Sequence, residues 1–184
     1  MEYGKSLGEL TIITGPMFSG KSTELIRVAS RLRSIGKKVL GVVHKIDDRY
    51  AEGGIITHNG AQWYENVVVA ERLTDVMVDG FDAIIVEELQ FFKDAFDNIV
   101  RWVEEKGISV ICAGLDGDFR REPFGDTLRL IPYADKVIKL NALCKSCGDG
   151  TAAHFSRRVI KSGDKVLVGG ATAYEAVCRK HFLE

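Results

Sequence analysis

Short apolar runs alternate with helical patterns in the first part of the chain. Leu10–Thr14 is apolar and β-branched, which predicts a strand, and the apolar positions from Ser22 to Ile35 recur at helical spacing. Gly36 ends that helix, and a second apolar run follows at Val39–His44. A strand, a helix and a strand in this order predict a right-handed β-α-β unit with parallel strands.

The same alternation continues to about residue 141. The segment Lys45–Asn66 is rich in turn-forming residues, so we expect loops and short strands there. Apolar runs and helical spacing then predict three strands and one helix: Ala83–Val86, a helix over about Lys93–Lys106, Ser109–Gly114 and Asp135–Leu140. Nearly all-apolar strands separated by helices predict an α/β domain over residues 1–141, with a mainly parallel sheet covered on both faces.

The pattern changes at Ala142. From there on Cys, Gly, Lys and Ser predominate, and only short β-like runs such as Val166–Val168 occur. A segment this short buries too little apolar surface to be stable by itself. We therefore expect residues 142–184 to form a small domain that depends on a metal ion or on docking.

Composition narrows the class of protein. Of 184 residues, 46% are hydrophobic and 28% charged, which is typical of a globular protein. With 25 basic and 26 acidic side chains the formal charge is −1, so we expect no nucleic-acid partner. The first residues lack the apolar core of a signal peptide, and no run is long enough to span a membrane. We expect a cytoplasmic protein with no membrane contact.

A phosphate-binding pattern lies between the first strand and the first helix. It has the form Gly-x-x-x-x-Gly-Lys-Ser and comprises Gly15, Pro16, Met17, Phe18, Ser19, Gly20, Lys21 and Ser22. Glycines let the backbone N–H groups face one anion at a helix N-terminus, while the lysine reaches the β- and γ-phosphates and the serine can ligate Mg²⁺. The alternative is an ordinary glycine turn, but the strand before it and the helix after it favour a nucleoside triphosphate site.

Two acids follow the strand Ala83–Val86. Glu87 and Glu88 stand at the carboxyl end of a buried parallel strand, which is where α/β sheets bind ligands. Adjacent strand residues point to opposite faces, so one acid can serve a metal ion and the other a proton transfer. Alone, the pair could be two solvated acids. Phosphoryl transfer needs both functions, however, so the phosphate-binding pattern favours the catalytic interpretation.

Four potential metal ligands lie in the C-terminal segment. Cys144 and Cys147 form one pair and Cys178 and His181 another, which together match a closed Cys₃His zinc site. Such a set leaves no open position for substrate, so the metal should be structural. Two disulfides are the alternative, and the expected reducing compartment disfavours them. Cys112 lies in an apolar strand and is expected to be a small buried hydrophobe.

Together these motifs resemble the type II thymidine kinase family over almost the whole chain. The matching motifs are Gly15–Ser22, Asp47-Asp48-Arg49-Tyr50, Glu87-Glu88-Leu89-Gln90-Phe91-Phe92, Gly114-Leu115-Asp116-Gly117-Asp118-Phe119, Glu122-Pro123-Phe124, Val168-Gly169-Gly170 with Tyr174, and Cys178-Arg179-Lys180-His181. The resemblance implies a P-loop NTPase (RecA-like) core with a small ribbon-like zinc domain. It also implies transfer of the ATP γ-phosphate to the 5′-hydroxyl of thymidine, giving dTMP for nucleotide salvage, with deoxyuridine as a second candidate substrate.

The resemblance assigns residues to the phosphoryl-transfer site. It makes Glu88 the base that accepts the hydroxyl proton, and it gives Mg²⁺ to Ser22 and Glu87, where the family usually has Asp in place of Glu87. Beside the phosphate loop, it assigns Asp47, Asp48, Arg49, Glu87, Glu88, Leu89 and Gln90 to ATP binding.

It also assigns a nucleoside pocket. Several members are large or aromatic, as a flat pyrimidine requires: Met17, Phe91, Leu115, Phe119, Phe124 and Tyr174. Main-chain groups of Lys165, Val166, Leu167, Val168 and Gly169 are expected to close over the base, and Ser156 to face it. For each of these singly, core packing is the alternative.

Two properties of the assembly follow from the resemblance alone, namely a homotetramer and feedback inhibition by thymidine triphosphate. Two other classes of protein stay open. A DNA-dependent ATPase with a zinc ribbon would need a basic stripe, which the sequence lacks. A regulatory nucleotide switch would leave Glu88 without a role.

Overall fold

A computed structural model describes residues 7–46, 54–56, 62–63, 65–160 and 172–184 of the chain. Several predicted site residues lie outside these ranges, namely Asp47, Asp48, Arg49, Lys165, Val166, Leu167, Val168 and Gly169. The predicted run Val166–Val168 lies outside them as well.

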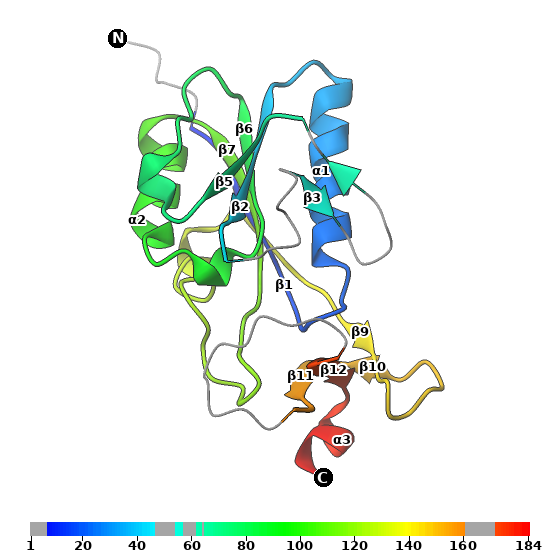
Figure 1. The fold of residues 1–184 in the computed structure, drawn as a ribbon. Helices are drawn as coiled ribbons and strands as arrows, with labels where there is room; N and C mark the ends of the chain where they lie inside the picture. Colours follow the sequence, from blue (N-terminus) through cyan, green and yellow to red (C-terminus); the bar gives the residue numbers. More distant parts are fainter. Residues whose placement is uncertain (1–6, 47–53, 57–61, 64, 161–171) are drawn as a thin grey trace.

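A six-stranded parallel sheet forms the centre of the molecule (Figure 1). Its order is β5-β2-β6-β7-β1-β8. The strands are β1 (Leu10–Thr14), β2 (Val39–His44), β5 (Val67–Ala70), β6 (Ala83–Val86), β7 (Ser109–Gly114) and β8 (Lys136–Lys139). Every pairing in this sheet is parallel, which confirms the predicted α/β architecture.

Helices cover both faces of the sheet. α1 (Lys21–Ser34) lies on one face, and α2 (Ala95–Val100), which continues as a π-helical turn over Arg101–Glu105, lies on the other (Figure 1). Alternate residues of each strand supply the two buried clusters: Ile12 and Ile84 pack towards α2, whereas their neighbours Ile13 and Ile85 pack towards α1.

The edge strand β5 was missed by the sequence analysis. Val67–Ala70 is a short apolar run, but two of its side chains, Val68 and Val69, are exposed, as befits a strand at the sheet edge. The turn-rich segment before it does contain short strands, as expected. β3 (Ile55–Ile56) and β4 (Gln62–Trp63) pair antiparallel.

The C-terminal elements form two small antiparallel ribbons and a short helix. They are β9 (Ala142–Leu143), β10 (Ala152–Ala153), β11 (Phe155–Arg158), β12 (Tyr174–Val177) and α3 (Arg179–Leu183). We call this group the zinc module. In Figure 1 it lies next to the end of the sheet where β1 leads into α1. The boundary at residue 142 stays a prediction, although β9 begins there.

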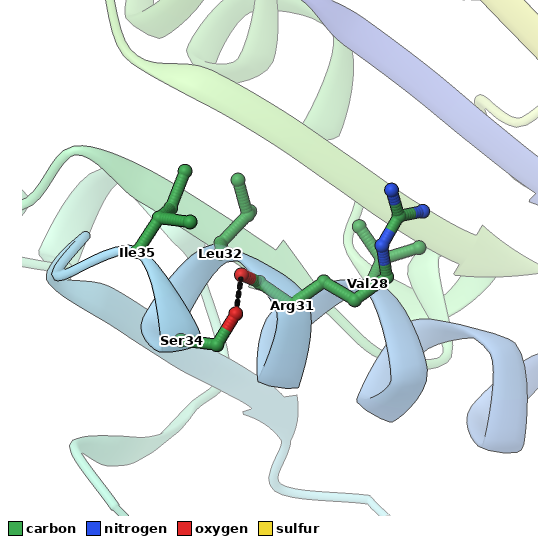
Figure 2. Close-up of a pocket in the computed structure, with 5 residues that line it drawn as sticks. All are labelled: Val28, Arg31, Leu32, Ser34 and Ile35. Atoms are coloured by element: carbon green, nitrogen blue, oxygen red, sulfur yellow. Dashed lines mark hydrogen bonds between the residues drawn. The ribbon is translucent and has the colours of Figure 1, made fainter.

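The far end of α1 carries a shallow depression of about 330 Å³, lined by Val28, Arg31, Leu32, Ser34 and Ile35 (Figure 2). There the Ser34 hydroxyl donates to the Arg31 carbonyl at 2.7 Å. The phosphate-binding pattern precedes the opposite end of the helix. Among the described residues, no helix has both the length and the hydropathy that crossing a membrane requires.

Candidate active site and metal centre

The phosphate loop has a backbone that requires glycine. Gly15 has φ 142°, and a Cβ atom there would lie 2.3 Å from the Leu140 carbonyl oxygen at the end of β8. Gly20, with φ 83°, directly precedes α1. Lys21 is buried, and its amine donates to the Pro16 carbonyl within the loop at 2.8 Å. The loop therefore curls round the position where the lysine amine and the N-terminus of α1 converge.

The middle of this loop contacts the zinc module. The Met17 N–H donates to the Ser156 hydroxyl on β11 at 2.9 Å. Phe18, which has φ 63°, packs against a buried cluster of the module: Ala142, Cys144, Ala153, Ala176 and Val177. Phosphate loop and module thus form one surface.

Glu87 and Ser22 meet across the sheet edge. The Ser22 hydroxyl donates to Glu87 Oε1 at 2.6 Å, and the Glu87 side chain is almost fully buried. Two oxygen-bearing side chains, one just after β6 and one in the first turn of α1, are thereby held next to the phosphate loop. Oxygen ligands of this kind suit Mg²⁺.

Glu88 adopts an unusual backbone conformation. β6 ends at Val86, and Glu88 has φ 52° and ψ 45°, the left-handed region that side chains rarely occupy. The sequence analysis expected the two acids to diverge because strand residues alternate. The two acids do have different partners. The reason is not strand alternation, however, because Glu88 lies beyond the strand and its left-handed backbone turns the chain there.

Gln90 connects Glu88 to the next strand. Its amide nitrogen donates to Glu88 Oε2, and its amide oxygen accepts from the Leu115 N–H at 3.0 Å, just beyond β7. Gln90 is buried, and Gly125, with φ 61°, packs so closely that a Cβ atom would lie 2.5 Å from the Gln90 carbonyl oxygen. The sequence analysis assigned Gln90 to ATP binding and did not foresee this bridge, because it depends on a loop distant in sequence.

Aromatic rings gather around Phe91, in the turn that follows Glu88. Phe91 and Phe124 meet edge to face with ring centroids 5.7 Å apart, and His44 lies 5.8 Å from Phe91. Burial lowers the pKa of His44, and its Nδ1 accepts from the Ile46 N–H at 3.0 Å, so the ring is neutral. The sequence analysis left His44 unassigned.

Phe119 and Tyr174 are brought together by a residue that the sequence analysis missed. The Arg158 guanidinium lies 3.8 Å from the centroid of the Phe119 ring and donates to the Tyr174 hydroxyl at 2.8 Å. Its position beside Arg157 in a polar segment gives no signal of this contact in the sequence.

The four predicted zinc ligands converge in the module. His181 Nδ1 lies 3.5 Å from the Cys144 sulfur and 3.4 Å from those of Cys147 and Cys178. The Cys147 and Cys178 sulfurs are 3.9 Å apart, too far for a disulfide. Zn–S bonds of about 2.3 Å and Zn–N bonds of about 2.0 Å at tetrahedral angles give edges of about 3.5 to 3.8 Å. The geometry therefore fits a closed structural zinc site.

Cys144 and Cys147 in this cluster do not both ionise easily. Burial opposes ionisation of Cys144, but backbone hydrogen bonds from Cys178 and Cys147 outweigh it and lower its pKa to about 6. Burial and the neighbouring Cys144 raise the pKa of Cys147 to about 11. Ionisation of Cys147 beside the Cys144 thiolate is thus unfavourable unless a cation is bound, which agrees with a metal-binding role. Cys112 lies outside the cluster and is buried in β7, as expected.

Comparison with known proteins identifies the family. The profile described as "Thymidine kinase" matches residues 8–182. The chain belongs to the thymidine kinase family. The thymidine kinase of Sheeppox virus is 41% identical over 190 residues, covering 100% of this chain and 100% of the viral protein.

Cellular relatives in the thymidine kinase family are similar to nearly the same extent. The thymidine kinase of Bacteroides thetaiotaomicron is 36% identical over 176 residues, with 96% of this chain and 87% of the relative covered. That of Thermococcus kodakarensis is 37% identical over 189 residues, with 96% and 94% covered. These matches confirm the family and the class of enzyme, a phosphotransferase, that the motifs predicted.

Proposed function

We propose that this chain transfers the γ-phosphate of ATP to the 5′-hydroxyl of thymidine, with Glu88 as the base. The observation that carries the proposal is that two adjacent acids after β6 have different partners, Glu87 being bonded to Ser22 and Glu88 to Gln90, in a chain of the thymidine kinase family. One acid adjoins the phosphate loop through Ser22. The other accepts a hydrogen bond from Gln90.

The phosphate loop is suited to hold the ATP phosphates. Its N–H groups and the N-terminus of α1 offer donors and a positive dipole end to an anion. We expect the Lys21 amine to exchange the Pro16 carbonyl for the β- and γ-phosphates when ATP binds. Arg49, with Asp47 and Asp48, is proposed to complete this site on the strength of the family motif.

Ser22 and Glu87 are proposed to hold Mg²⁺. When bound, Mg²⁺ would supply positive charge beside the β- and γ-phosphates. The buried Glu87 carboxylate and the Ser22 hydroxyl are already paired at 2.6 Å, which fixes their orientation towards the loop.

Glu88 is proposed to accept the 5′-hydroxyl proton. As it does so, the hydroxyl oxygen forms a bond to the γ-phosphorus, the bond from that phosphorus to the β–γ bridging oxygen breaks, and ADP leaves. The Gln90 amide holds the Glu88 carboxylate in place, and its link to Leu115 ties the base to the loop that carries Phe119 and Phe124.

The nucleoside pocket is proposed to form between this loop and the zinc module. Phe91 and Phe124 offer ring edges and faces next to Glu88, and Met17 lies where the phosphate loop meets β11. Ser156, whose hydroxyl oxygen accepts from Met17, is proposed to line the base side of the pocket. Lys165, Val166, Leu167, Val168 and Gly169 are proposed to cover the base through main-chain groups.

The zinc ion is proposed to be structural, because three thiolates and one imidazole fill its coordination sphere. A cytoplasmic location, a homotetramer, inhibition by thymidine triphosphate and the absence of a nucleic-acid partner are proposed from the family resemblance and the charge balance.

The test is to supply purified protein with ATP, Mg²⁺ and each common nucleoside, with and without single-stranded DNA. We expect thymidine to be phosphorylated, and Glu88→Gln to lower kcat by about 10²- to 10⁴-fold while ATP still binds. Glu104→Gln makes the same chemical change at an exposed position and should behave like the unaltered protein. ATP hydrolysis that needs no nucleoside and rises with DNA would contradict the proposal.

A further inference from the structure

The β11–β12 ribbon has two faces with different partners. Side chains alternate along a strand, so Ser156 and Arg158 share one face. These two residues reach out of the module, to Met17 of the phosphate loop and to Phe119 of the loop after β7. The face they form is therefore the one that the module turns towards the sheet.

The other face of the ribbon is occupied within the module. Arg157 donates through Nε to Glu175 Oε1 at 2.8 Å and through a second nitrogen to the His181 carbonyl. These contacts join the ribbon to the helix that supplies a metal ligand. Neighbouring arginines thus have separate tasks, since Arg157 acts inside the module and Arg158 acts across its boundary.

Arg158 contacts two aromatic residues at once. Its guanidinium stacks on Phe119, its Nη2 donates to the Tyr174 hydroxyl, and Tyr174 is its directly opposite partner on β12. A planar guanidinium can stack and donate in its own plane at the same time, which an ammonium group does less well. Its contacts therefore fix a ring from the loop relative to a ring from the module.

The loop that carries Phe119 is stiff in itself. Asp118 Oδ1 accepts from the N–H groups of Arg120 at 2.8 Å and Glu122 at 3.0 Å, and Asp118 is buried. The Leu115 N–H ties the start of the loop to Gln90. Because these bonds hold the backbone of the loop, the Phe119 side chain can change its conformation without moving the Leu115–Gln90–Glu88 link.

We propose that Arg158 is a positioning residue for the nucleoside, which holds Phe119 and Tyr174 together as one wall of the pocket. This inference rests on the proposed function, because the pocket is part of it. Without the guanidinium the two rings lose their common partner, and a nucleoside has to order them on binding. Loss of the guanidinium should therefore weaken nucleoside binding. ATP binding and the chemical step should be unaffected, because they depend on other residues.

The experiment compares Arg158→Met with Arg120→Met by steady-state kinetics. Arg120 also lies over the Phe119 ring, at 5.1 Å, but it is exposed, so it is a matched control. We expect Arg158→Met to raise the thymidine KM about tenfold or more, the effect of one cation–π contact and one hydrogen bond. The ATP KM and kcat should change by less than about threefold, and Arg120→Met should change none of the three by more than about twofold.

Smaller variants guard against loss of folding. Arg158→Lys keeps the charge and should raise the thymidine KM less than Arg158→Met does. Tyr174→Phe removes the hydroxyl partner alone and should raise it about threefold, an effect that should vanish in the Arg158→Met background. If Arg158→Met does not fold, these expectations for Arg158→Lys and the single Tyr174→Phe variant decide the matter.

Three results would overturn the inference: an unchanged thymidine KM, a parallel rise in the ATP KM, or loss of zinc from Arg158→Met. The last two would make Arg158 part of the framework of the module. Failure of the proposed function would look different, because the unaltered protein would then phosphorylate no thymidine at all.

Discussion

The phosphate loop and the nucleoside side of the site are built in contrasting ways. The loop is one continuous segment between β1 and α1, and its shape depends on local backbone angles and on the buried sheet below it. The proposed nucleoside side combines Phe91, the loop after β7 and the β11–β12 ribbon, which are distant in sequence. A continuous segment can be recognised in the sequence as a motif. A site assembled from distant segments depends on residues that join them, and these form no motif.

The two regions also differ in what stabilises them. The sheet buries large side chains such as Trp102 and Phe92, whereas the largest buried side chain in the apolar cluster of the module is Val177. Such a small cluster contributes little hydrophobic stabilisation, so the zinc site has to supply the rest. Damage to the module should therefore weaken thymidine binding more than ATP binding.

Removal of zinc should have the largest effect. With a chelator, or in Cys178→Ala, we expect thymidine phosphorylation to fall by more than about 100-fold, since folding of such a module depends on metal binding. ATP binding should weaken but persist, because β1, α1 and the phosphate loop lie on the sheet. A metal assay measures the bound zinc, titration calorimetry the ATP affinity and far-ultraviolet circular dichroism the folding of the sheet, beside the phosphorylation assay.

The control is Cys112→Ala, which removes a buried thiol outside the cluster and should retain zinc. Simultaneous unfolding of the sheet on chelation would show that the two regions are not separable in this way.

Gly15→Ala should damage the opposite region. A Cβ atom 2.3 Å from the Leu140 carbonyl, added to a positive φ, should cost about 3 kcal/mol of stability or distort the loop. ATP affinity should then fall at least about 30-fold, while zinc content stays unchanged. Urea unfolding and ATP titration measure both effects.

Gly36→Ala provides the comparison for this variant. Gly36 also has a positive φ, 83°, but among the described residues no heavy atom lies within 4 Å of the position that a Cβ atom would take there. Only the backbone penalty of about 1 kcal/mol should therefore appear. Equal losses of ATP affinity in both variants would argue against the close approach to Leu140 as the cause.

Gln90→Leu should slow the chemical step, with an effect smaller than that of zinc removal and larger than that of the Ser156 variant below. It removes the donor that orients Glu88 and leaves the Leu115 N–H without its acceptor. We expect kcat to fall about 30-fold, because a slightly misplaced base loses much of its effect, with ATP affinity unchanged. Single-turnover kinetics measure this, and Gln62→Leu, at an exposed position, should be silent.

Ser156→Ala should have the smallest effect. Loss of one hydrogen bond from the Met17 N–H corresponds to about 1 kcal/mol, or about fivefold in ATP affinity. Ser156→Thr keeps the hydroxyl and should retain the affinity. If Ser156→Ala leaves ATP affinity unaltered, the module does not support the phosphate loop through this bond.

Much of the fold could be predicted because the inner strands β1, β2, β6 and β7 are buried on both faces and nearly all apolar. β5 was not predicted, since a four-residue edge strand with exposed valines resembles a loop in the sequence. At the site, Lys21, Glu87 and Cys144 belong to fixed spacings that chemistry imposes. The Gln90 bridge and the Arg158 contacts could not be predicted, because they join segments whose proximity exists only in the folded chain.

The left-handed backbone of Glu88, the proposed base, sets selection for stability against selection for activity at a single residue. Glycine or asparagine would occupy φ 52° at less cost, by roughly 1 kcal/mol, yet neither carries a carboxylate. A library selected only for heat resistance should therefore enrich inactive variants at this position. Engineering a more durable enzyme from this chain would have to hold residue 88 constant and seek its gains elsewhere.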